Sequence, residues 1–562
     1  MKKIIALILA LLMLFSVTAC RKKQTASSDN SSTVVSADSE YEDTASDDFT
    51  SDEEVTDEAS SKEDTVDEDF DDIKLPDTQS MVDTTPSKDN VSADITVSSE
   101  PETEQTVIEV DENDKAFVKN PAPLSYPMTS KFDAQADALR SRIQNSTDVL
   151  PATVTGKIWY ISNSGNDSNS GNSKDDAWAS IDALNSYSSR IKAGDAVLFE
   201  RGGVFRGSFA TKSNVYYGAY GTGDKPCIYG SAQNYAKVNW KKKFGNIWIC
   251  DTYIPDDVGI IVFNHGESVG YKRDKKYEMQ QNGDFWCEGD GAVTLYLYMD
   301  KNPGEAFKSI EIGIRKDIIS IRSCENTVVE NLCIKYTGAH AITGGGVKNV
   351  TVKNCEIGFI GGSYLKDYWR QYTRYGNGIQ FWSKNEDVLV ENNWIYQIYD
   401  SGITHQGDGN YTAKNLTFNE NLVEYCGMGS IEYWTNYYTG EGGYNISENV
   451  TYSNNILRFA GYCWGGLQRF DKERSGHIIS DVSCHNNKKN FKIINNIFDQ
   501  STAPLIDIGS TDNTLPVLSG NTYAQSKGAL LGAYGDKTGI LFEAGVENII
   551  GSIDKAAKVV WY

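Results

Sequence analysis

The chain has 562 residues, enough for one large repeat domain, and a formal net charge of −24 at pH 7. Nearly all of that charge lies in residues 21–120, so residues 121–562 are close to neutral. A protein that binds phosphate backbones needs a basic face, and the longest basic run in the neutral part is Lys241–Lys243. The sequence therefore argues against a nucleic-acid partner.

Residues 1–20 have the pattern of an export signal. Lys2 and Lys3 precede an apolar stretch, Ile4–Val17, that is too short to span a membrane. The following Val-Thr-Ala-Cys20 resembles a bacterial lipobox, which implies that Cys20 becomes the lipidated N-terminus. We expect the mature protein on the extracellular face of the bacterial cell membrane, with the membrane as a partner through this anchor. The alternative is an ordinary secretory signal with a cysteine by chance.

Residues 21–150 are rich in Ser, Thr, Asp and Glu and contain few clustered apolar side chains. Such a segment cannot bury enough apolar surface to offset the conformational entropy of ordering it. We expect a disordered acidic linker that holds the following domain, residues 151–562, away from the membrane.

The domain opens with three recognisable stretches. They are Trp159-Tyr-Ile-Ser-Asn-Ser-Gly-Asn-Asp167, Gly194-Asp-Ala-Val-Leu-Phe199, and Ala219-Tyr-Gly-Thr-Gly-Asp-Lys-Pro226. Together they resemble the start of secreted bacterial right-handed parallel β-helix proteins of the pectate-lyase-like superfamily. The resemblance implies an all-β, right-handed, single-stranded parallel β-helix that acts on a polysaccharide. Lyases, hydrolases and esterases share this fold, so the fold does not settle the reaction.

A repeated turn supports the same fold. A short strand that opens with Asn or Asp and ends in Asn five or six residues later, followed by a second apolar strand, recurs every 23 to 41 residues, which is too short for each repeat to bury a core alone. The copies begin at Asn326, Asn349, Asp387, Asn415, Asn449 and Asn490. We expect stacked coils whose turns are held by ladders of side-chain amides.

Two segments depart from the repeat. Residues 236–315 contain short strands without the Asn turn, and we expect a flanking insertion that walls one side of a cleft. A helical stretch near Ser180–Ile191 is expected to cover the open end of the coil.

Aligning the coils on their Asn turns predicts the functional face. Each coil carries an inward Ile or Leu, and strand alternation then directs the next residue outward. The predicted polar row consists of Thr343, Gln380, Thr404, Glu432 and Gln468. Two positions further on, a second outward row contains Trp382, Gln406, Trp434 and Phe470. Rings beside amides and carboxylates suit a sugar chain; the alternative is a solvated polar row beside rings that cover loops.

Two carboxylates are candidates for glycoside hydrolysis. Glu432 lies in the predicted polar row, and Asp400 precedes the strand of the neighbouring coil, so a separation of about 4.8 Å between coils was expected to bring them close. The apolar neighbours Tyr433 and Trp434 favour Glu432 as the acid. Asp400 is equally well read as a turn residue that bonds its own backbone.

Further candidates have two readings each. His405 is either a general base or an interior histidine. Arg469 is either a ligand for a substrate carboxylate or an ion-pair partner of a nearby acid. Asn377 is a weaker candidate at the edge of the cleft.

Glycoside hydrolysis is the leading hypothesis, with no cofactor or metal expected. A polysaccharide lyase is the second; it would need a basic residue such as Lys366, Arg374 or Lys384 as base and often calcium. A non-catalytic carbohydrate-binding surface protein is the third. We expect a monomer. The nine cysteines beyond Cys20 lack the spacing of a zinc site and are expected to be mostly buried thiols, with a disulfide left open.

Overall fold

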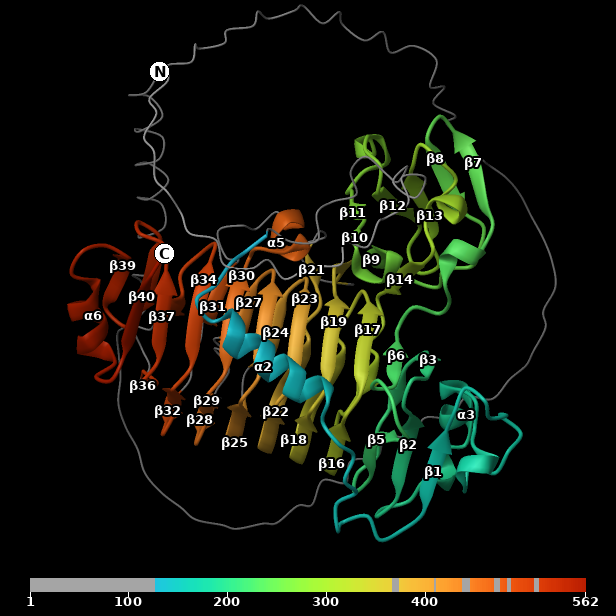
Figure 1. Ribbon diagram of the computed structural model, residues 1–562, viewed down its shortest axis with the longest axis horizontal. Coiled ribbons are helices and arrows are strands. Elements are labelled where there is room, and N and C mark those ends of the chain that lie inside the picture. Colours follow the sequence, from blue (N-terminus) through green and yellow to red (C-terminus); the bar gives the residue numbers. More distant parts are fainter. Residues whose placement is uncertain are drawn as a thin grey trace, which may run out of the picture. The chain divides into compact units, whose positions relative to one another are not determined.

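The computed structural model describes residues 127–365, 373–408, 411–436, 445–469, 476–482, 487–509 and 515–562. The predicted export signal with Cys20, and the predicted linker as far as residue 126, lie outside these ranges. Inside them, no helix is both long and apolar enough to cross a membrane. The described residues form a right-handed parallel β-helix, which confirms the predicted fold (Figure 1).

Three sheets run along the coil. Sheet 1 contains β4 (Phe209–Ala210), β15 (Ile319–Ser320), the first part of β18 (Ile342–Lys353), the first part of β22 (Ile379–Glu391), β24 (Ser401–Asp408), β27 (Gly429–Asn436), β31 (His477–Val482), β35 (Ile506–Ile508) and β38 (Leu530–Tyr534). Sheet 2 contains β1 (Ile158–Ile161), β2 (Ala196–Glu200), β5 (Tyr216–Tyr220), β16 (Glu325–Glu330), the second parts of β18 and β22, β25 (Thr412–Asn419), β28 (Ile446–Glu448), β29 (Thr451–Ser453), β32 (Asn487–Lys489), β33 (Lys492–Ile494) and β36 (Val517–Ser519).

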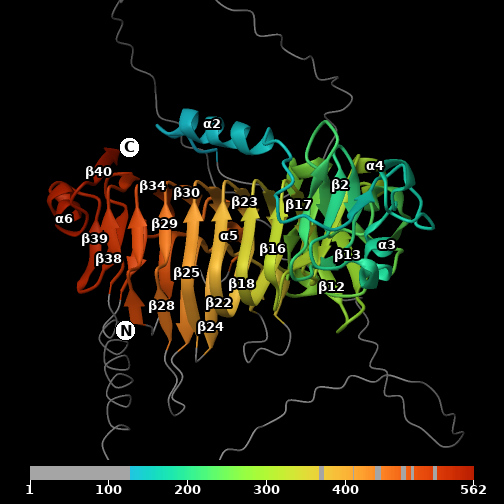
Figure 2. The same cartoon turned by 90° about the horizontal axis from the view of Figure 1, so that it is seen from below.

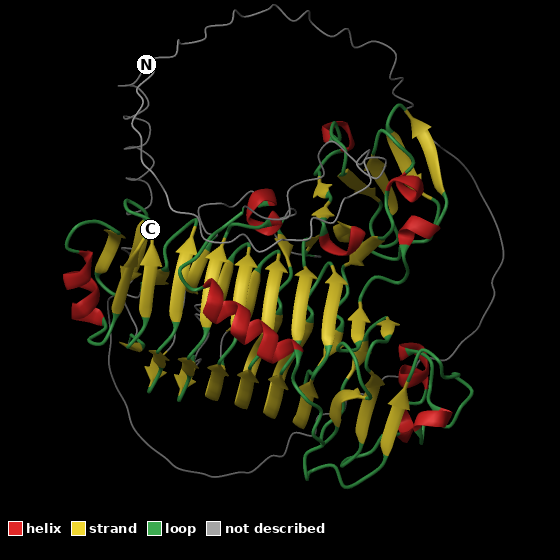
Figure 3. Ribbon diagram, in the orientation of Figure 1, coloured by secondary structure: helices red, strands yellow, loops and turns green. Residues whose placement is uncertain are grey.

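Sheet 3 has ten strands in parallel order along the coil (Figure 3). They are β3 (Val204–Arg206), β6 (Cys227–Tyr229), β17 (Cys333–Thr337), β19 (Glu356–Ile360), β23 (Trp394–Ile398), β26 (Leu422–Cys426), β30 (Ile456–Ala460), β34 (Ile497–Ser501), β37 (Thr522–Gln525) and β40 (Lys558–Trp561). Sheets 1 and 2 are continuous where β18 and β22 pass from one to the other, with a register shift between Gly345 and Val347.

Asparagine ladders close the turns, as expected from the repeat. The turn residues that begin and end each copy have left-handed backbones, such as Asn326 with φ 51° and Asn354 with φ 55°, a conformation that Asn adopts more readily than most residues. A buried ladder runs through the amides of Asn393, Asn421, Asn455, Asn496 and Asn521 at 2.9 to 3.0 Å per step. Each step satisfies polar groups that are shielded from water.

Short helices cover the two ends of the coil. α3 (Ile181–Ser186) begins at Ser180, whose hydroxyl accepts from the Ala183 amide, and it buries Ile181 and Leu184 in the core. This confirms the predicted cap. At the other end lie α6 (Val546–Ile553) and the antiparallel strand β39 (Lys537–Leu541).

The segment before the coil corrects the predicted extent of the linker. Residues 133–144 form α2 (Asp133–Gln144), which lies along the outer face of sheet 3 (Figure 2). Its apolar stripe packs on that sheet, and Arg140 pairs with the buried Glu424 at 2.9 Å. The stripe spaced at Ala136, Leu139 and Ile143 buries enough apolar surface to hold the helix in place. Residues 127–150 are therefore part of the fold.

The insertion at 236–315 has a core of its own. One sheet contains β7 (Trp240–Phe244), β8 (Ile247–Cys250), β11 (Tyr271–Lys272), β12 (Asp284–Glu288) and β13 (Thr294–Tyr298), and another contains β9 (Val258–Phe263), β10 (Ser268–Val269) and β14 (Ile310–Ile314). A short helix, α4 (Pro303–Ala306), precedes β14. The insertion leaves the coil after β6 and returns before β15.

Candidate functional site

Sheet 1 carries the predicted polar row in four neighbouring strands. Thr343 pairs with Gln380, Gln380 with Thr404, and Thr404 with Glu432. The preceding residue of each strand is an isoleucine with no exposed surface: Ile342, Ile379, Ile403 and Ile431. The register predicted from the asparagine turns is therefore confirmed for these strands.

The fifth predicted member is wrong. Residues 464–468 form α5 (Trp464–Gln468) outside the sheet, so Gln468 does not continue the row. The next strand of sheet 1 is β31, where Ser480 pairs with Glu432, and Asp507 of β35 pairs with Ser480. This coil is longer than its neighbours, because the chain makes a helix before it returns. The polar row of sheet 1 is therefore Ser320, Thr343, Gln380, Thr404, Glu432, Ser480 and Asp507.

Most of this row is shielded from solvent rather than solvated. Thr343 and Thr404 have no exposed surface, Glu432 is 7% exposed and Gln380 is 8% exposed. Hydrogen bonds fix the polar groups: Ser401 Oγ donates to Glu432 Oε2 at 2.8 Å, and Asn377 Nδ2 donates to Gln380 Oε1 at 2.8 Å. These hydrogen bonds hold the side chains of Glu432 and Gln380 in fixed orientations.

Asn377 is the hub of this network. Its side-chain Oδ1 accepts from the Ser401 backbone amide at 2.9 Å, and its backbone amide donates to His340 Nδ1 at 2.9 Å. Burial lowers the pKa of His340 to about 4, which keeps its ring neutral and able to accept. Asn377 therefore connects the row to the neighbouring coil.

One cation reaches the row from the side of Thr343. Arg322 donates to Thr343 Oγ1 at 3.0 Å and lies 3.9 Å from an Asp317 carboxylate oxygen, while half of its side chain stays exposed. Aligning the coils on their Asn turns did not reveal Arg322, because this residue lies in a loop, two residues after the end of β15.

The aromatic row lies beside the polar row. Trp382, Gln406 and Trp434 occupy one register line across three strands, and all are half-buried, while Phe470 lies outside the described residues. The two indole rings lean over the intervening strand, with centroids 5.8 Å apart and planes tilted by 36°. Tyr433 does not join them, because it points into the core with no exposed surface. It therefore cannot form part of the apolar surroundings expected for Glu432.

His405 lies inside the coil, which corrects its candidacy as a general base. It is 1% exposed, and its two ring nitrogens contact the hydroxyls of Tyr411 and Tyr452. Burial lowers its pKa to about 3, so the ring is neutral over the physiological range. Strand alternation explains the placement, because a residue two positions after the inward Ile403 also points inward.

Asp400 and Arg469 form an ion pair away from the polar row. Arg469, which follows α5, contacts Asp400 Oδ1 at 2.8 Å. Asp400 precedes β24 by one residue, whereas the partner of Glu432 on that strand is Thr404. Asp400 therefore lies four positions upstream of Glu432 in register, about 13 Å along the strand direction. This register separates the two backbones, whereas the Glu432 carboxylate reaches back to Ser401, the residue that follows Asp400.

Gln468 joins the insertion to the coil instead of facing a ligand. Its Nε2 donates to the Gly270 carbonyl at 2.8 Å, and its Oε1 accepts from the Lys272 amide at 3.2 Å. Arg374, a base candidate for a lyase, is buried and donates to the Gly362 carbonyl at 2.6 Å. Lys384 is exposed on β22, where it pairs with Thr412 in sheet 2, and Lys366 lies outside the described residues.

Asp507 is the acidic residue that sequence reasoning missed. It follows Ile506 as Glu432 follows Ile431, so the same Ile-polar pattern marks it. Its register line places it two coils from Glu432, roughly 10 Å between Cα atoms. Its side chain is 43% exposed, and its Oδ2 lies 3.4 Å from His477 Nε2. Two carboxylates of different exposure thus flank Ser480.

No family model and no curated protein matches this chain. Solved structures with some likeness include the complex of XylC with xylose, with 13% identity over 72% of this chain and 82% of that chain, TM-score 0.35. A GH136 lacto-N-biosidase from Eubacterium ramulus has 15% identity over 77% and 70% of the two chains, TM-score 0.34. The pectate lyase Pel9A has 10% identity over 70% and 81%, TM-score 0.32. Likenesses of this size carry no argument about activity.

Proposed function

We propose that the protein is a cell-surface glycoside hydrolase that binds and cleaves a polysaccharide across sheet 1. The observation that carries the proposal is the pair of carboxylates, Glu432 and Asp507, on one register line of the coil. Glycoside hydrolases that invert use two carboxyl groups about 6.5–9.5 Å apart, which leaves room for a water molecule. The register places the Cα atoms of Glu432 and Asp507 two coils apart, roughly 10 Å.

The different exposure of the two carboxylates suggests their roles. Glu432 is almost buried and held by Ser401, which suits an acid that touches only the oxygen of the scissile bond. Asp507 is open to solvent, which suits a base that takes a proton from water. From the sequence we expect Asp400 as the second catalytic carboxylate. In this proposal Asp507 takes that role, and Asp400 is the ion-pair partner of Arg469.

The remaining residues of the face are assigned to sugar binding. Trp382 and Trp434 offer ring faces to the apolar faces of pyranoses, and Gln406 lies between them. Among the polar side chains beside them, Gln380 is assigned to a sugar hydroxyl group, since it is 8% exposed. Asn377, Thr343 and Thr404 are almost or fully buried, so they are assigned to holding Gln380 and its neighbouring strands in place.

One observation favours a second candidate, a polysaccharide lyase. The half-exposed Arg322 beside Thr343 places a guanidinium where a uronate carboxylate can bind. Calcium belongs to this alternative only. A panel of plant and host glycans separates the candidates: a hydrolase yields reducing ends alone, a lyase yields ultraviolet-absorbing unsaturated ends, and a binding protein yields neither.

The location of the protein follows from the leader sequence. We propose that Cys20 carries the lipid and that the protein is tethered to the outer side of the cell membrane. A Cys20→Ser variant should move from the membrane pellet to the soluble fraction. If the variant were recovered in the pellet in the same amount as the unchanged protein, Cys20 would not be the membrane anchor.

A further inference from the structure

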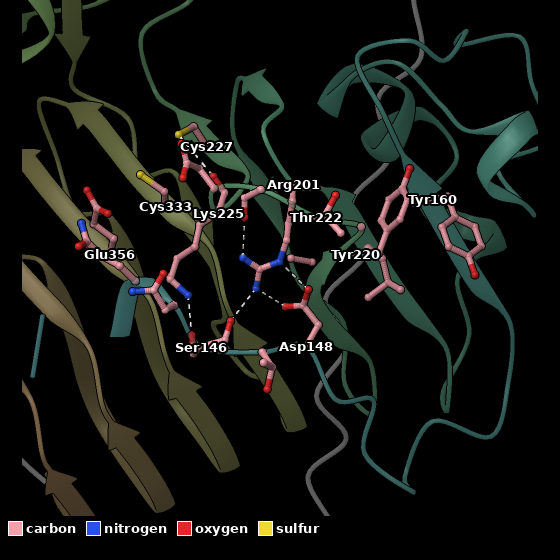
Figure 4. A pocket seen from close by; sticks show the side chains of 18 of the residues that line it. Ser146, Asp148, Tyr160, Arg201, Tyr220, Thr222, Lys225, Cys227, Cys333 and Glu356 are labelled. Carbon is pink, nitrogen blue, oxygen red and sulfur yellow. Dashed lines mark hydrogen bonds and ion pairs between the residues drawn. The ribbon is translucent and has the colours of Figure 1, made fainter. Parts of the chain in front are cut away.

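A cavity lies on the other side of the coil from the proposed active site. It has a volume of about 920 Å³ and is an open pocket lined by the chain that follows α2 and by the first coils of sheets 2 and 3 (Figure 4). Its polar lining includes Ser146, Arg201, Lys225 and Glu356. Two cysteines, Cys227 of β6 and Cys333 of β17, also line it.

The two cysteines are direct register partners on parallel strands. Neighbouring strands of a sheet lie about 4.8 Å apart, and a disulfide requires Cα atoms about 4.4–6.8 Å apart. Both side chains lie on the cavity side of sheet 3, where they are hydrogen bonded to each other. The usual spacing of paired strands therefore falls within the range of Cα distances that a disulfide requires.

The surroundings distinguish the two thiols. The hydrogen bond from Cys333 and, after it, the charge of Lys335 lower the pKa of Cys227. The same hydrogen bond and burial raise the pKa of Cys333. Cys227 is half-buried, whereas Cys333 is 4% exposed. A thiolate that a small molecule can reach is the attacking group in thiol–disulfide exchange, so Cys227 is the first of the pair to react.

We propose that Cys227 and Cys333 are a redox-active dithiol that a low-molecular-weight disulfide, entering through the cavity, converts to an intramolecular disulfide. The Cys227 thiolate attacks one sulfur of the small disulfide, forms a mixed disulfide and releases one small thiolate. The Cys333 thiol then loses its proton and attacks the Cys227 sulfur, which releases the second small thiolate. Two protein thiols are oxidised and one small disulfide is reduced to two thiols, so electrons and atoms balance.

A disulfide between Cys227 and Cys333 would join the last coil before the insertion to the first coil after it. Cys227 lies just before the insertion and Cys333 lies in the first strand of sheet 3 after it. A bridge here closes a loop that contains the whole insertion at 236–315, and long closed loops lose the most chain entropy in the unfolded state. Oxidation should therefore raise the melting temperature by several degrees, about what loop closure on this scale provides.

The chain offers a matched control pair. Cys426 and Cys463 are also close enough to influence each other electrostatically, but both have no exposed surface and neither lines the cavity. If proximity alone governed oxidation, this pair would react as readily as Cys227 and Cys333. If access through the cavity governs it, only the cavity pair reacts.

The test is peptide mapping of the full chain after incubation with oxidised glutathione and alkylation of the remaining thiols. We expect a linked peptide that contains Cys227 and Cys333, reversed by dithiothreitol, and alkylated Cys426 and Cys463. In Cys333→Ser, Cys227 should keep a glutathione adduct, and in Cys227→Ser, Cys333 should stay free. Alkylation of both cysteines in the unchanged chain, or an adduct on Cys333 instead of Cys227, overturns the proposal. Glycan cleavage is not read, so the result is independent of the proposed function.

Discussion

Ser401 Oγ donates a 2.8 Å hydrogen bond to Glu432 Oε2 and thereby links two neighbouring strands of sheet 1. The residue before Ser401 is Asp400, which pairs with Arg469, and the Ser401 amide donates to Asn377. The side chain of Glu432 therefore leans back along the strand toward the start of β24. Its carboxylate is oriented by the coil before any ligand arrives, as a catalytic group needs to be.

Replacing Asp507 distinguishes it from Asp400 as the second carboxylate. Asp507→Asn should lower the rate of glycan cleavage by about 10²–10⁴, the usual contribution of a general base. Asp400→Asn weakens the pair with Arg469 and should cost less than about tenfold. Product analysis by NMR should show an inverted anomeric centre in the unchanged protein. A retained configuration, or a larger loss in Asp400→Asn, would refute the assignment of Asp507.

The two tryptophans should contribute to affinity rather than to the chemical step. Trp382→Ala and Trp434→Ala each remove one ring of the pair and should weaken glycan binding by about 1 kcal/mol, about fivefold in Kd. Tyr253→Ala is the control, since Tyr253 is a large exposed ring, 75% accessible, on the insertion. Isothermal titration with an uncleaved oligosaccharide measures the effect. Equal loss in all three variants would mean that the tryptophans form no specific platform.

The buried asparagine ladder should dominate local stability. Asn421 accepts from Asn393, donates to Asn455 and to the Val390 carbonyl, and has no exposed surface. Asn421→Ala leaves several buried groups unpaired and should cost about 3–5 kcal/mol of unfolding free energy.

The exposed ladder supplies the control for that variant. Asn449 bonds Asn415 at the surface with φ 56°, and Asn449→Gly keeps the left-handed backbone, so it should cost less than about 1 kcal/mol. Urea denaturation of both variants gives the comparison. Similar losses would show that buried and exposed ladders contribute alike.

Acid should weaken the fold through two histidines. Burial holds the pKa of His405 at about 3 and that of His340 at about 4, while an unfolded histidine titrates near 6.5. Between these values the unfolded chain binds more protons than the folded chain, so stability falls as the pH is lowered from about 6.5. The slope is at most about 1.4 kcal/mol per pH unit for each histidine.

Denaturation at several pH values between 5 and 7 checks this slope. His405→Gln should flatten the slope, and the exposed His265→Gln should leave it unchanged. A slope that persists in His405→Gln and falls in His265→Gln would contradict the burial argument.

The fold and the register of sheet 1 could be predicted because one local rule repeats. A residue in the left-handed conformation, in most coils an asparagine, ends each strand of sheet 2 from β16 to β33, and each strand of sheet 1 from β18 to β27 carries an inward isoleucine, so aligning the turns aligned Thr343, Gln380, Thr404 and Glu432. The same alternation, applied strictly, also directs His405 and Tyr433 inward. Those two errors came from weighing residue type above strand position.

The remaining errors have a different origin. The coil that holds α5 is longer than its neighbours, so no repeat marks where sheet 1 resumes, and Ser480 and Asp507 went unnoticed. The pairing of Arg469 with Asp400 depends on where that helix lies, which local sequence does not encode. The linker composition hid α2, because three apolar residues suffice when a sheet face is already there to receive them.

The most direct test of the account is the activity of Glu432→Gln on a glycan that the unchanged protein both binds and cleaves. Glu386→Gln is the matched control, since Glu386 is a half-buried glutamate on β22 whose carboxylate lies 3.4 Å from the Lys348 ammonium nitrogen. We expect release of reducing ends to fall by at least about 10² in Glu432→Gln, with binding retained and Glu386→Gln unaffected. Undiminished release of reducing ends by a folded Glu432→Gln protein would contradict the central claim.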